Sequence, residues 1–253
     1  MTDLSGTTAL VTGGTSGLGL AMVRALRAAG AAVAFTGRSP DRTDTTEREV
    51  DGAVGLVADA RDEAAVESAV DAAWHALGGI DLLVNNAGIG MRTVNPRFMT
   101  EPQGFWQVEP EGFRAVVDTN LTGYFLAARS VVPRMLERGR GRIVNVSMNH
   151  TTMNRRGFVP YGPSRAGAEA LSRIMAADLA GSGITVNLLL PGGATATGMV
   201  PDDAPAVPGM RVLDAAVMGP PIVWLASPAA ADVHDERIVA VDFERWLAAR
   251  RAA

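Results

Sequence analysis

The chain has 253 residues, of which 47% are hydrophobic and 20% are charged, and its formal net charge is -4 at pH 7. This length and composition suit one large globular domain and exclude an intrinsically disordered chain or a collagen-like one. The acidic balance argues against nucleic acid as a partner, because phosphate binding requires a clustered basic surface. Without cysteine, the chain can form no disulfide and offers no thiolate to a metal.

The sequence carries no clear targeting or metal-binding signal. The first residues, MTDLSGTTALVTGG, lack the basic segment and long apolar stretch that are typical of a signal peptide. No run reaches the roughly 18 apolar residues of a membrane span. These features predict a cytoplasmic protein with no membrane partner. The histidines His75, His150 and His234 have no spacing typical of a metal site, so we predict no metal.

Short apolar runs alternate with amphipathic stretches through most of the chain. The runs predict strands at residues 9–12, 32–36, 54–58, 80–84, 142–147, 184–190 and 237–241. The amphipathic stretches predict helices at residues 18–29, 62–77, 111–138 and 164–180. Strands that are apolar at consecutive positions are typical of a parallel sheet buried on both faces. The pattern therefore predicts an α/β fold, a single doubly wound parallel sheet flanked by helices.

The chain shows no internal division. No repeat, low-complexity tract or linker interrupts it, so residues 1–253 are predicted to form a single domain. Residues 192–221, which are rich in Gly, Pro, Ala and Met, predict a mobile flap over the substrate. Residues 242–253 predict a C-terminal helix.

A glycine-rich turn, TGGTSGLG at residues 12–19, follows the first predicted strand and opens the first predicted helix. Its spacing, G-x-x-x-G-x-G, is related to the dinucleotide fingerprint, in which glycines let the backbone approach a diphosphate and the helix amides point at the phosphates. We predict that the cofactor contacts the following residues of this turn: Gly13, Thr15, Ser16, Gly17, Leu18 and Gly19.

Arg38, after the second predicted strand, bears on the choice of cofactor. An NAD site usually has a carboxylate there for the ribose 2′-hydroxyl, whereas an arginine can pair with the 2′-phosphate of NADP. We therefore expect NADP rather than NAD; an exposed turn arginine without a ligand is the alternative.

Asp59, followed by Ala60, ends the third predicted strand and is a second candidate contact of the cofactor. Its carboxylate can accept a hydrogen bond from adenine or cap the next helix.

Further motifs, in their order along the chain, resemble the classical short-chain dehydrogenase/reductase family. They are NNAG at residues 85–88, Asn120 in DTNLTGYF, IVNVS ending at Ser147, YGPSR at residues 161–165 and VNLLLPGG at residues 186–193. The resemblance covers roughly residues 5–200 and implies a Rossmann fold with hydride transfer by a nicotinamide cofactor, coupled to proton transfer from Tyr161. It also implies two sets of cofactor contacts: Asn86, Ala87 and Gly88 at the adenosine ribose, and Pro191, Gly192, Ala194, Thr195 and Thr197 at the nicotinamide.

The family's YxxxK motif reads Tyr161-Gly-Pro-Ser-Arg165 in this chain. One helical turn separates the two positions, so both lie on one helix face. In the family, this lysine holds the nicotinamide ribose and favours the phenolate form of the tyrosine. Arg165 could do both, but its planar group is bulkier and differently directed. The resemblance also implies that Asn120 binds a relay water through a helix irregularity; an ordinary polar residue within a helix is the alternative.

The serine of the family lies thirteen residues before the tyrosine in most members, and that position is Met148 here. Ser147 lies fourteen residues before Tyr161. Because strand side chains alternate between faces, this offset matters unless the chain bulges. We predict Ser147 as the hydrogen-bond donor to the substrate carbonyl, with Thr151, Thr152 or no residue as alternatives.

Apolar side chains near the predicted site suggest the substrate and the assembly. They come from two segments and are Phe98, Phe105, Trp106, Met148, Met153 and Phe158. Such a wall favours a bulky ketone or alcohol, and loop packing without substrate contact is the alternative. Small residues at 166–170 resemble the family's helical dimer interface, so we expect self-association as a dimer or tetramer.

The sequence thus predicts an NADP-dependent oxidoreductase that transfers a hydride between nicotinamide and a ketone or alcohol. The alternative is a protein of the same fold with lost or altered redox chemistry, either a biosynthetic isomerase or dehydratase or a cofactor-binding regulatory subunit.

The basic residues have an unusual composition, because all 23 of them are arginine. A biased coding background explains this absence of lysine, and selection against amines by an electrophilic substrate or product is the alternative.

Overall fold

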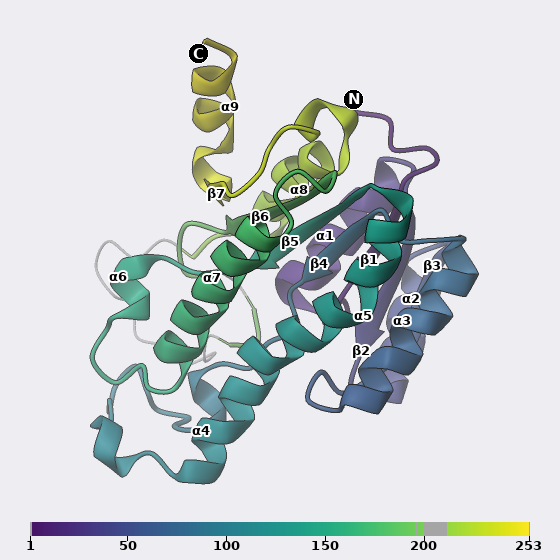
Figure 1. Ribbon diagram of the computed structural model, residues 1–253. Coiled ribbons are helices and arrows are strands. Elements are labelled where there is room, and N and C mark those ends of the chain that lie inside the picture. Colours follow the sequence, from purple (N-terminus) through teal and green to yellow (C-terminus); the bar gives the residue numbers. More distant parts are fainter. Residues whose placement is uncertain (1, 196, 200–211, 253) are drawn as a thin grey trace.

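The computed structural model describes residues 2–195, 197–199 and 212–252. A parallel sheet with the strand order β3-β2-β1-β4-β5-β6-β7 lies at the centre of the molecule (Figure 1). Its strands are β1 (Thr8–Val11), β2 (Ala32–Gly37), β3 (Ala53–Val57), β4 (Leu82–Asn85), β5 (Gly141–Val146), β6 (Ile184–Leu190) and β7 (Arg237–Val239). The chain winds outward from β1 to β3, returns to β4 beside β1, and winds outward again to β7. The predicted doubly wound Rossmann-type fold is confirmed.

Helices cover both faces of the sheet (Figure 1). They are α1 (Gly17–Ala28), α2 (Pro40–Glu49), α3 (Glu63–Leu77), α4 (Pro110–Val117), α5 (Gly123–Arg138), α6 (His150–Met153), α7 (Tyr161–Asp178), α8 (Gly219–Ala226) and α9 (Phe243–Ala252). Helices α3, α5 and α7 pack on one face, and α1 and α8 pack on the other. The sequence pattern did not indicate α2, because its residues PDRTDTTERE have almost no apolar side chains and bury only Thr43 and Thr46.

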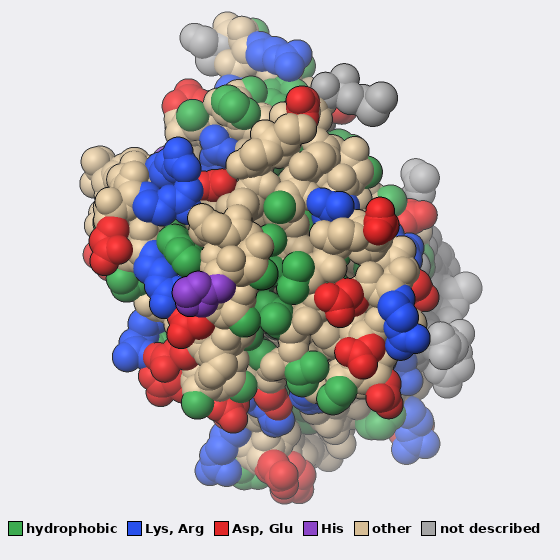
Figure 2. All heavy atoms as spheres, turned by 90° about the vertical axis from the view of Figure 1, so that its right-hand side faces the viewer, with side chains coloured by type: hydrophobic (Ala, Val, Ile, Leu, Met, Phe, Trp, Pro, Cys, Tyr) green, Lys and Arg blue, Asp and Glu red, His purple; other side chains and the backbone are tan. Residues whose placement is uncertain are grey.

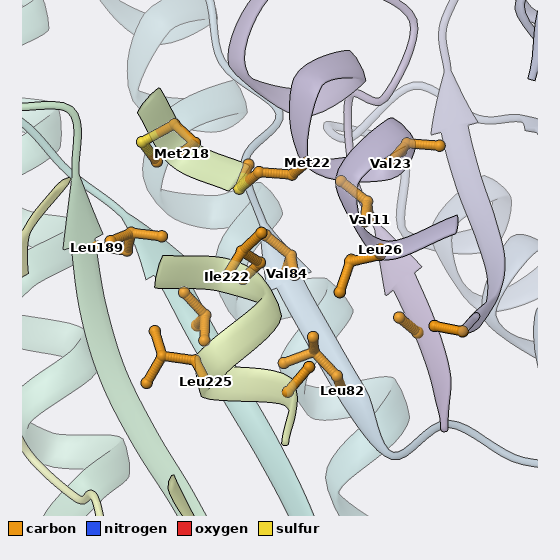
Figure 3. Packing of buried hydrophobic residues seen from close by; sticks show 14 of the residues in the cluster. Val11, Met22, Val23, Leu26, Leu82, Val84, Leu189, Met218, Ile222 and Leu225 are labelled. Carbon is orange, nitrogen blue, oxygen red and sulfur yellow. The ribbon is translucent and has the colours of Figure 1, made fainter. Parts of the chain in front are cut away.

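The apolar runs of the strands are buried on both faces, as the consecutive spacing predicted. Figure 3 shows the core between the sheet and helices α1 and α8. There Leu82 and Val84 of β4 face Met22 and Leu26 of α1 and Ile222 of α8. Alternate strand residues, such as Leu83, enter a second core beneath α3, α5 and α7. At about 25 cal/mol per Å² of buried apolar surface, these two cores are the main stabilising term of the fold.

The predicted helix at residues 111–138 is interrupted. A π-helical segment, Asp118–Thr122, separates α4 from α5. The interruption shifts the helical register at Asn120, which is fully buried. Such π segments leave one carbonyl without its usual partner and occur frequently at functional sites.

The outer surface carries mixed charge. Across α3 and α5, Arg129 pairs with Glu63 and Glu67, and Arg134 pairs with Asp71. Acidic and basic side chains are likewise interspersed on the face shown in Figure 2. None of the helices in the described part of the chain is both long and apolar enough to cross a membrane.

The end of the chain and the predicted flap complete the fold. Helix α9 lies where a C-terminal helix was predicted, and its Phe243 and Leu247 are buried against the first core. Of the flap predicted at residues 192–221, positions 196 and 200–211 lie outside the described residues. The described parts that flank this gap meet in a single bridge between Thr195 and Leu213.

Candidate active site

A cleft of about 640 Å³ opens at the carboxyl ends of the parallel strands. This is the edge where β1 and β4 lie side by side while their connections leave in opposite directions, the switch point at which open α/β sheets bind ligands. The volume lies within the usual range of ligand sites, roughly 300–1,000 Å³. The cleft receives side chains from the glycine-rich turn, from the ends of β2 to β6 and from the start of α7.

The glycine-rich turn forms one end of the cleft. Gly13 and Gly17 have φ values of +67° and +53°, which favour glycine. A Cβ on Gly19 would lie 2.1 Å from the Gly13 carbonyl oxygen, so the start of α1 packs directly on the turn. The Ser16 side chain does not cap α1, and the first helical turn has no acidic residue. Thr15, Ser16, Gly17 and Leu18 line the cleft. The uncapped amides and the positive end of the helix fit a diphosphate.

Asn86 and Ala87 attach the end of β4 to this turn. The Asn86 side-chain amide donates hydrogen bonds to the carbonyls of Thr12 and Gly13, each at 3.0 Å. The Thr12 hydroxyl accepts from the backbone N–H groups of Asn86 and Ala87 at 3.0 and 3.1 Å. The two residues therefore fix the shape of the turn and also line the cleft.

Two arginines and one carboxylate surround the far end of the cleft. Arg38, at the end of β2, lines it together with Arg42 from the first turn of α2. Asp59 and Ala60 lie opposite them. The Asp59 carboxylate accepts hydrogen bonds from Arg61, which lower its pKa; burial opposes this effect, and the charge of Arg38 adds to it. This carboxylate is therefore ionised. Arg42 was not predicted, because the sequence pattern did not indicate the helix that places it at the cleft.

Tyr161 and Arg165 lie one turn apart at the start of α7, as their spacing predicted. Tyr161 is partly exposed to the cleft, whereas Arg165 is only 3% exposed. The guanidinium carbon of Arg165 lies 5.4 Å from the centre of the Tyr161 ring and 5.5 Å from that of Tyr124. Burial opposes the charge of Arg165, but its interactions with the two tyrosines raise its pKa above the usual value. A permanent cation thus lies beside the Tyr161 phenol.

The π segment places Asn120 behind this pair. The Asn120 side chain accepts a hydrogen bond from the Ile89 N–H at 2.9 Å and donates to the Ile89 carbonyl and to the Ser164 hydroxyl, both at 3.0 Å. It therefore joins the chain just after Gly88 to the first turn of α7. The predicted helix irregularity is present, and the Asn120 side chain uses its polar atoms in protein contacts.

Ser147 and Met148 both line the cleft at the end of β5. The Ser147 hydroxyl donates to Glu169 Oε1 at 2.5 Å. The same carboxylate contacts His150 at 3.1 Å and Arg237 at 3.0 Å. Ser147 thus belongs to a polar cluster beneath the cleft. The prediction that Ser147 orients the substrate stays a prediction. Glu169 was missed because a single carboxylate on a helix gave no signal in the sequence.

The wall of the cleft next to Tyr161 is apolar. Phe98 and Phe158 make an edge-to-face contact with their ring centres 5.6 Å apart, and Met91, Met148 and Met153 complete the cluster. Phe105, Trp106 and Met153 differ from the prediction, because they do not line the cleft. Phe105 and Trp106 are 69% and 76% exposed, whereas Met153 is buried in the cluster. The two exposed rings contact each other in a turn that projects away from the sheet.

The chain after β6 closes the remaining side of the cleft. Pro191, Gly193, Ala194, Thr195 and Thr197 line it, and the Met199 sulfur lies 3.8 Å from the Tyr161 hydroxyl. Gly192 has a φ of +100°, and a Cβ there would lie 2.4 Å from the Val241 side chain. No group of three or more His, Asp or Glu residues that could hold a metal occurs within residues 2–195, 197–199 and 212–252.

Known proteins share this sequence pattern and this fold. Residues 7–207 match the family model described as short chain dehydrogenase. A 2-dehydro-3-deoxy-L-rhamnonate dehydrogenase (NAD(+)) from a Sphingomonas species is 36% identical over 187 residues, 74% of this chain and 72% of that protein. A 3-oxoacyl-(acyl-carrier-protein) reductase of Vibrio cholerae is 30% identical over 244 residues, 93% of this chain and 96% of its own.

Solved structures give the same result. The crystal structure of 3-ketoacyl-(acyl-carrier-protein) reductase from Brucella melitensis, complexed with NADH, superimposes with a TM-score of 0.82 at 29% identity and covers 94% of this chain and 97% of that one. The family match extends over most of the chain, and the parallel sheet agrees with the fold of this solved relative. The chain therefore belongs to the short-chain dehydrogenase/reductase family and is an oxidoreductase that acts on hydroxyl or keto groups.

Proposed function

We propose that this protein is an NADP-dependent reductase or dehydrogenase that transfers a hydride between nicotinamide and a ketone or alcohol with a bulky apolar body. The observation that carries the proposal is the pairing of a cleft-facing phenol, Tyr161, with a buried permanent cation, Arg165. This pair lies at the carboxyl edge of the sheet, in the same cleft as the glycine-rich turn after β1, which fits a diphosphate.

Each residue of this arrangement has a distinct task. The bound cofactor supplies the hydride. Tyr161 donates the proton to the carbonyl oxygen in reduction and removes it in oxidation, acting as a general acid–base. The Arg165 cation stabilises the phenolate form that arises in each turnover and contacts the nicotinamide ribose. Asn120 has a positioning role, because its hydrogen bonds fix the chain beside Gly88 and the start of α7.

A further donor must orient the substrate carbonyl, and we propose Thr152 for this task. A hydroxyl has one hydrogen to donate. The hydrogen of Ser147 is directed at Glu169. Thr152 also lines the cleft, and among the described residues its hydroxyl has no hydrogen-bond partner. A donor placed where negative charge develops typically contributes about 10²–10³-fold in kcat.

The preference for NADP is supported by Arg38 and Arg42. Both side chains reach the end of the cleft beyond β2, and neither forms an ion pair with an acidic group in the described part of the chain. Two guanidinium groups at this place suit the dianionic 2′-phosphate. The carboxylate of Asp59 is held by Arg61 on the other side and is available to the adenine amino group.

The preference for a bulky apolar substrate is supported by Met91, Phe98, Met148 and Phe158, which line the cleft and belong to an apolar cluster packed against Tyr161. Large apolar groups on a substrate gain most from such a wall, at about 25 cal/mol per Å² buried.

We also propose self-association through α5 and α7, whose exposed apolar side chains include Phe125 and Ile174.

A second function is favoured by one observation. Met148 faces the cleft where the family has its serine, while Ser147 is bonded to Glu169. A site altered in this way suits a protein of the family that binds the cofactor but has lost or changed its redox chemistry.

One experiment distinguishes the two functions. NADPH oxidation is followed with a panel of aliphatic, aromatic and polycyclic ketones, and NADPH binding is titrated in parallel. The proposed function predicts turnover that is fastest with bulky ketones. Tight NADPH binding without turnover of any ketone, or of the corresponding alcohols with NADP, would favour the second function.

A further inference from the structure

The environment of Arg165 is unusual for a buried charge. Its side chain is 3% exposed, yet no carboxylate lies within ion-pair distance of it in the described part of the chain. Buried charges are ordinarily paired or fully hydrogen-bonded, because the loss of hydration is costly. Its Nη1 atom donates to the Tyr124 hydroxyl at 2.5 Å and to the Val146 carbonyl at 3.0 Å. The Nε atom has no hydrogen-bond partner among the described residues.

Tyr124 therefore takes the place that a carboxylate usually has beside a buried arginine. It lies at the start of α5, is 1% exposed, and donates its own hydrogen to the Val146 carbonyl at 3.0 Å. Burial raises the pKa of the Tyr124 phenol, and Arg165 opposes this rise only in part. The phenol is thus neutral at ordinary pH. It fixes the guanidinium through an oxygen lone pair and, unlike a carboxylate, leaves the positive charge uncancelled.

The other side of the guanidinium faces the cleft. Nη2 lies so close to Gly88 that a Cβ there would be 2.4 Å from it. Arg165, Gly88 and Tyr161 all line the cleft. The planar group is held between the rings of Tyr124 and Tyr161, with one nitrogen anchored to the protein and the opposite nitrogen directed to the cleft.

We propose that Tyr124 is a positioning residue whose hydroxyl sets the orientation of Arg165 and thereby makes an arginine competent at this place in the site. An arginine delivers its hydrogen bonds in one plane, so it needs a fixed orientation, whereas an ammonium group donates in several directions and does not. The inference rests on the proposed function where it is tested by kcat. Its second test, the affinity for NADPH, needs no turnover.

The test is a cycle of four proteins: the parent, Tyr124→Phe, Arg165→Lys and the double variant. In the parent background, Tyr124→Phe is expected to lower kcat at least tenfold with the ketone KM changed less than about threefold. A displacement of about 1 Å costs on the order of 100-fold in rate. NADPH should bind more weakly in the same variant. In the Arg165→Lys background, removal of the same hydroxyl should change kcat and the NADPH Kd less than about threefold.

Ser172→Ala provides the matched control. Ser172 lies on α7, and its buried hydroxyl accepts from Asn145 and donates to Ala168, away from the cleft. This variant loses a buried hydroxyl as Tyr124→Phe does, and it should retain parental kcat and NADPH affinity. Circular dichroism and thermal unfolding confirm that each variant is folded.

The outcomes separate the inference from the proposed function. Equal losses on removing the Tyr124 hydroxyl in the arginine and lysine backgrounds would show a general structural role and overturn the inference, and so would parental kcat and NADPH affinity in Tyr124→Phe. If the parent turns over no ketone or alcohol, the proposed function fails. The NADPH titrations of the four proteins then decide the role of Tyr124 alone.

Discussion

The Ser147 hydroxyl donates its hydrogen to Glu169 Oε1 at 2.5 Å, although Ser147 itself lines the cleft next to Met148. Glu169 receives further hydrogen bonds from His150 and from Arg237, and Arg237 also donates to the Met148 carbonyl at 2.7 Å. Glu169 thus fixes the chain that leaves β5, directly through Ser147 and indirectly through Arg237, which contacts Met148.

The first prediction compares two hydroxyls at the cleft. Thr152→Val is expected to lower kcat by about 10²-fold, because it removes the donor to the developing oxyanion. Ser147→Ala should lower kcat less than tenfold, because its hydrogen is directed at Glu169. Steady-state kinetics with the best ketone of the panel measures both. The reverse order of the two losses would return the orienting role to Ser147.

The second prediction concerns the pH dependence of stability. Burial opposes ionisation of Glu169, but the hydrogen bonds from Ser147, His150 and Arg237 outweigh it, so its pKa is below the usual value of 4.5. A carboxylate with a lowered pKa in the folded state contributes stability above about pH 4.5 that is lost as the pH falls. Glu169→Gln should therefore reduce the unfolding free energy at pH 7 by about 1–3 kcal/mol, with a smaller reduction at pH 4.

Urea unfolding at pH 7, 5 and 4 measures this difference. The matched control is Glu67→Gln, which breaks only an exposed pair with Arg129 and should cost less than about 1 kcal/mol. A reduction for Glu169→Gln that stayed constant from pH 7 to pH 4 would refute the role of its ionisation.

The third prediction uses the close approach of Gly88 and Arg165. A methyl group on Gly88 would lie 2.4 Å from Nη2, so Gly88→Ala must displace the guanidinium. We expect a loss of kcat on the order of 100-fold. Gly112→Ala on α4 is the control, because its new methyl group would meet Val94 at an ordinary 3.5 Å. Parental kinetics of Gly88→Ala would mean that the position of Arg165 is unimportant for catalysis.

The fourth prediction concerns the choice of cofactor. Arg38→Ala should weaken NADPH binding about 10–100-fold, because a hydrogen bond to a charged group contributes about 1.5–3 kcal/mol, and it should leave NADH binding within about twofold. Arg48→Ala on α2 is the control, since the Arg48 side chain donates to the Asp44 carbonyl and does not line the cleft. Similar losses for both cofactors in Arg38→Ala would count against the 2′-phosphate assignment.

Much of the fold followed from the sequence because the strands are buried on both faces and read as continuous apolar runs, while α1 follows directly from its glycine-rich turn. The structure places Tyr161 and Arg165 on one helix face because a single helical spacing determines that relationship. Arg42, Tyr124 and Glu169 were not identified. Tyr124 and Glu169 act through contacts with residues more than twenty positions away, and such pairs leave no periodic signal in one chain.

The departures also have physical causes. The predicted helix at residues 111–138 is interrupted around Asn120. The buried side-chain amide of Asn120 makes hydrogen bonds to Ile89 and Ser164, and these require a local change of helical register that the spacing of apolar residues does not indicate. Phe105 and Trp106 were expected at the cleft on the basis of their size, yet they make an edge-to-face contact with each other at the surface. Side-chain type alone does not determine which way a loop folds.

The central claim is that the Tyr161 phenol transfers the proton that accompanies hydride transfer. The most direct measurement is single-turnover oxidation of bound NADPH by a ketone in the parent and in Tyr161→Phe, with NADPH affinity titrated in both. We predict that Tyr161→Phe binds NADPH with an affinity within about threefold of the parent and oxidises it at least about 10²-fold more slowly. Parental single-turnover rates in the variant would contradict the account.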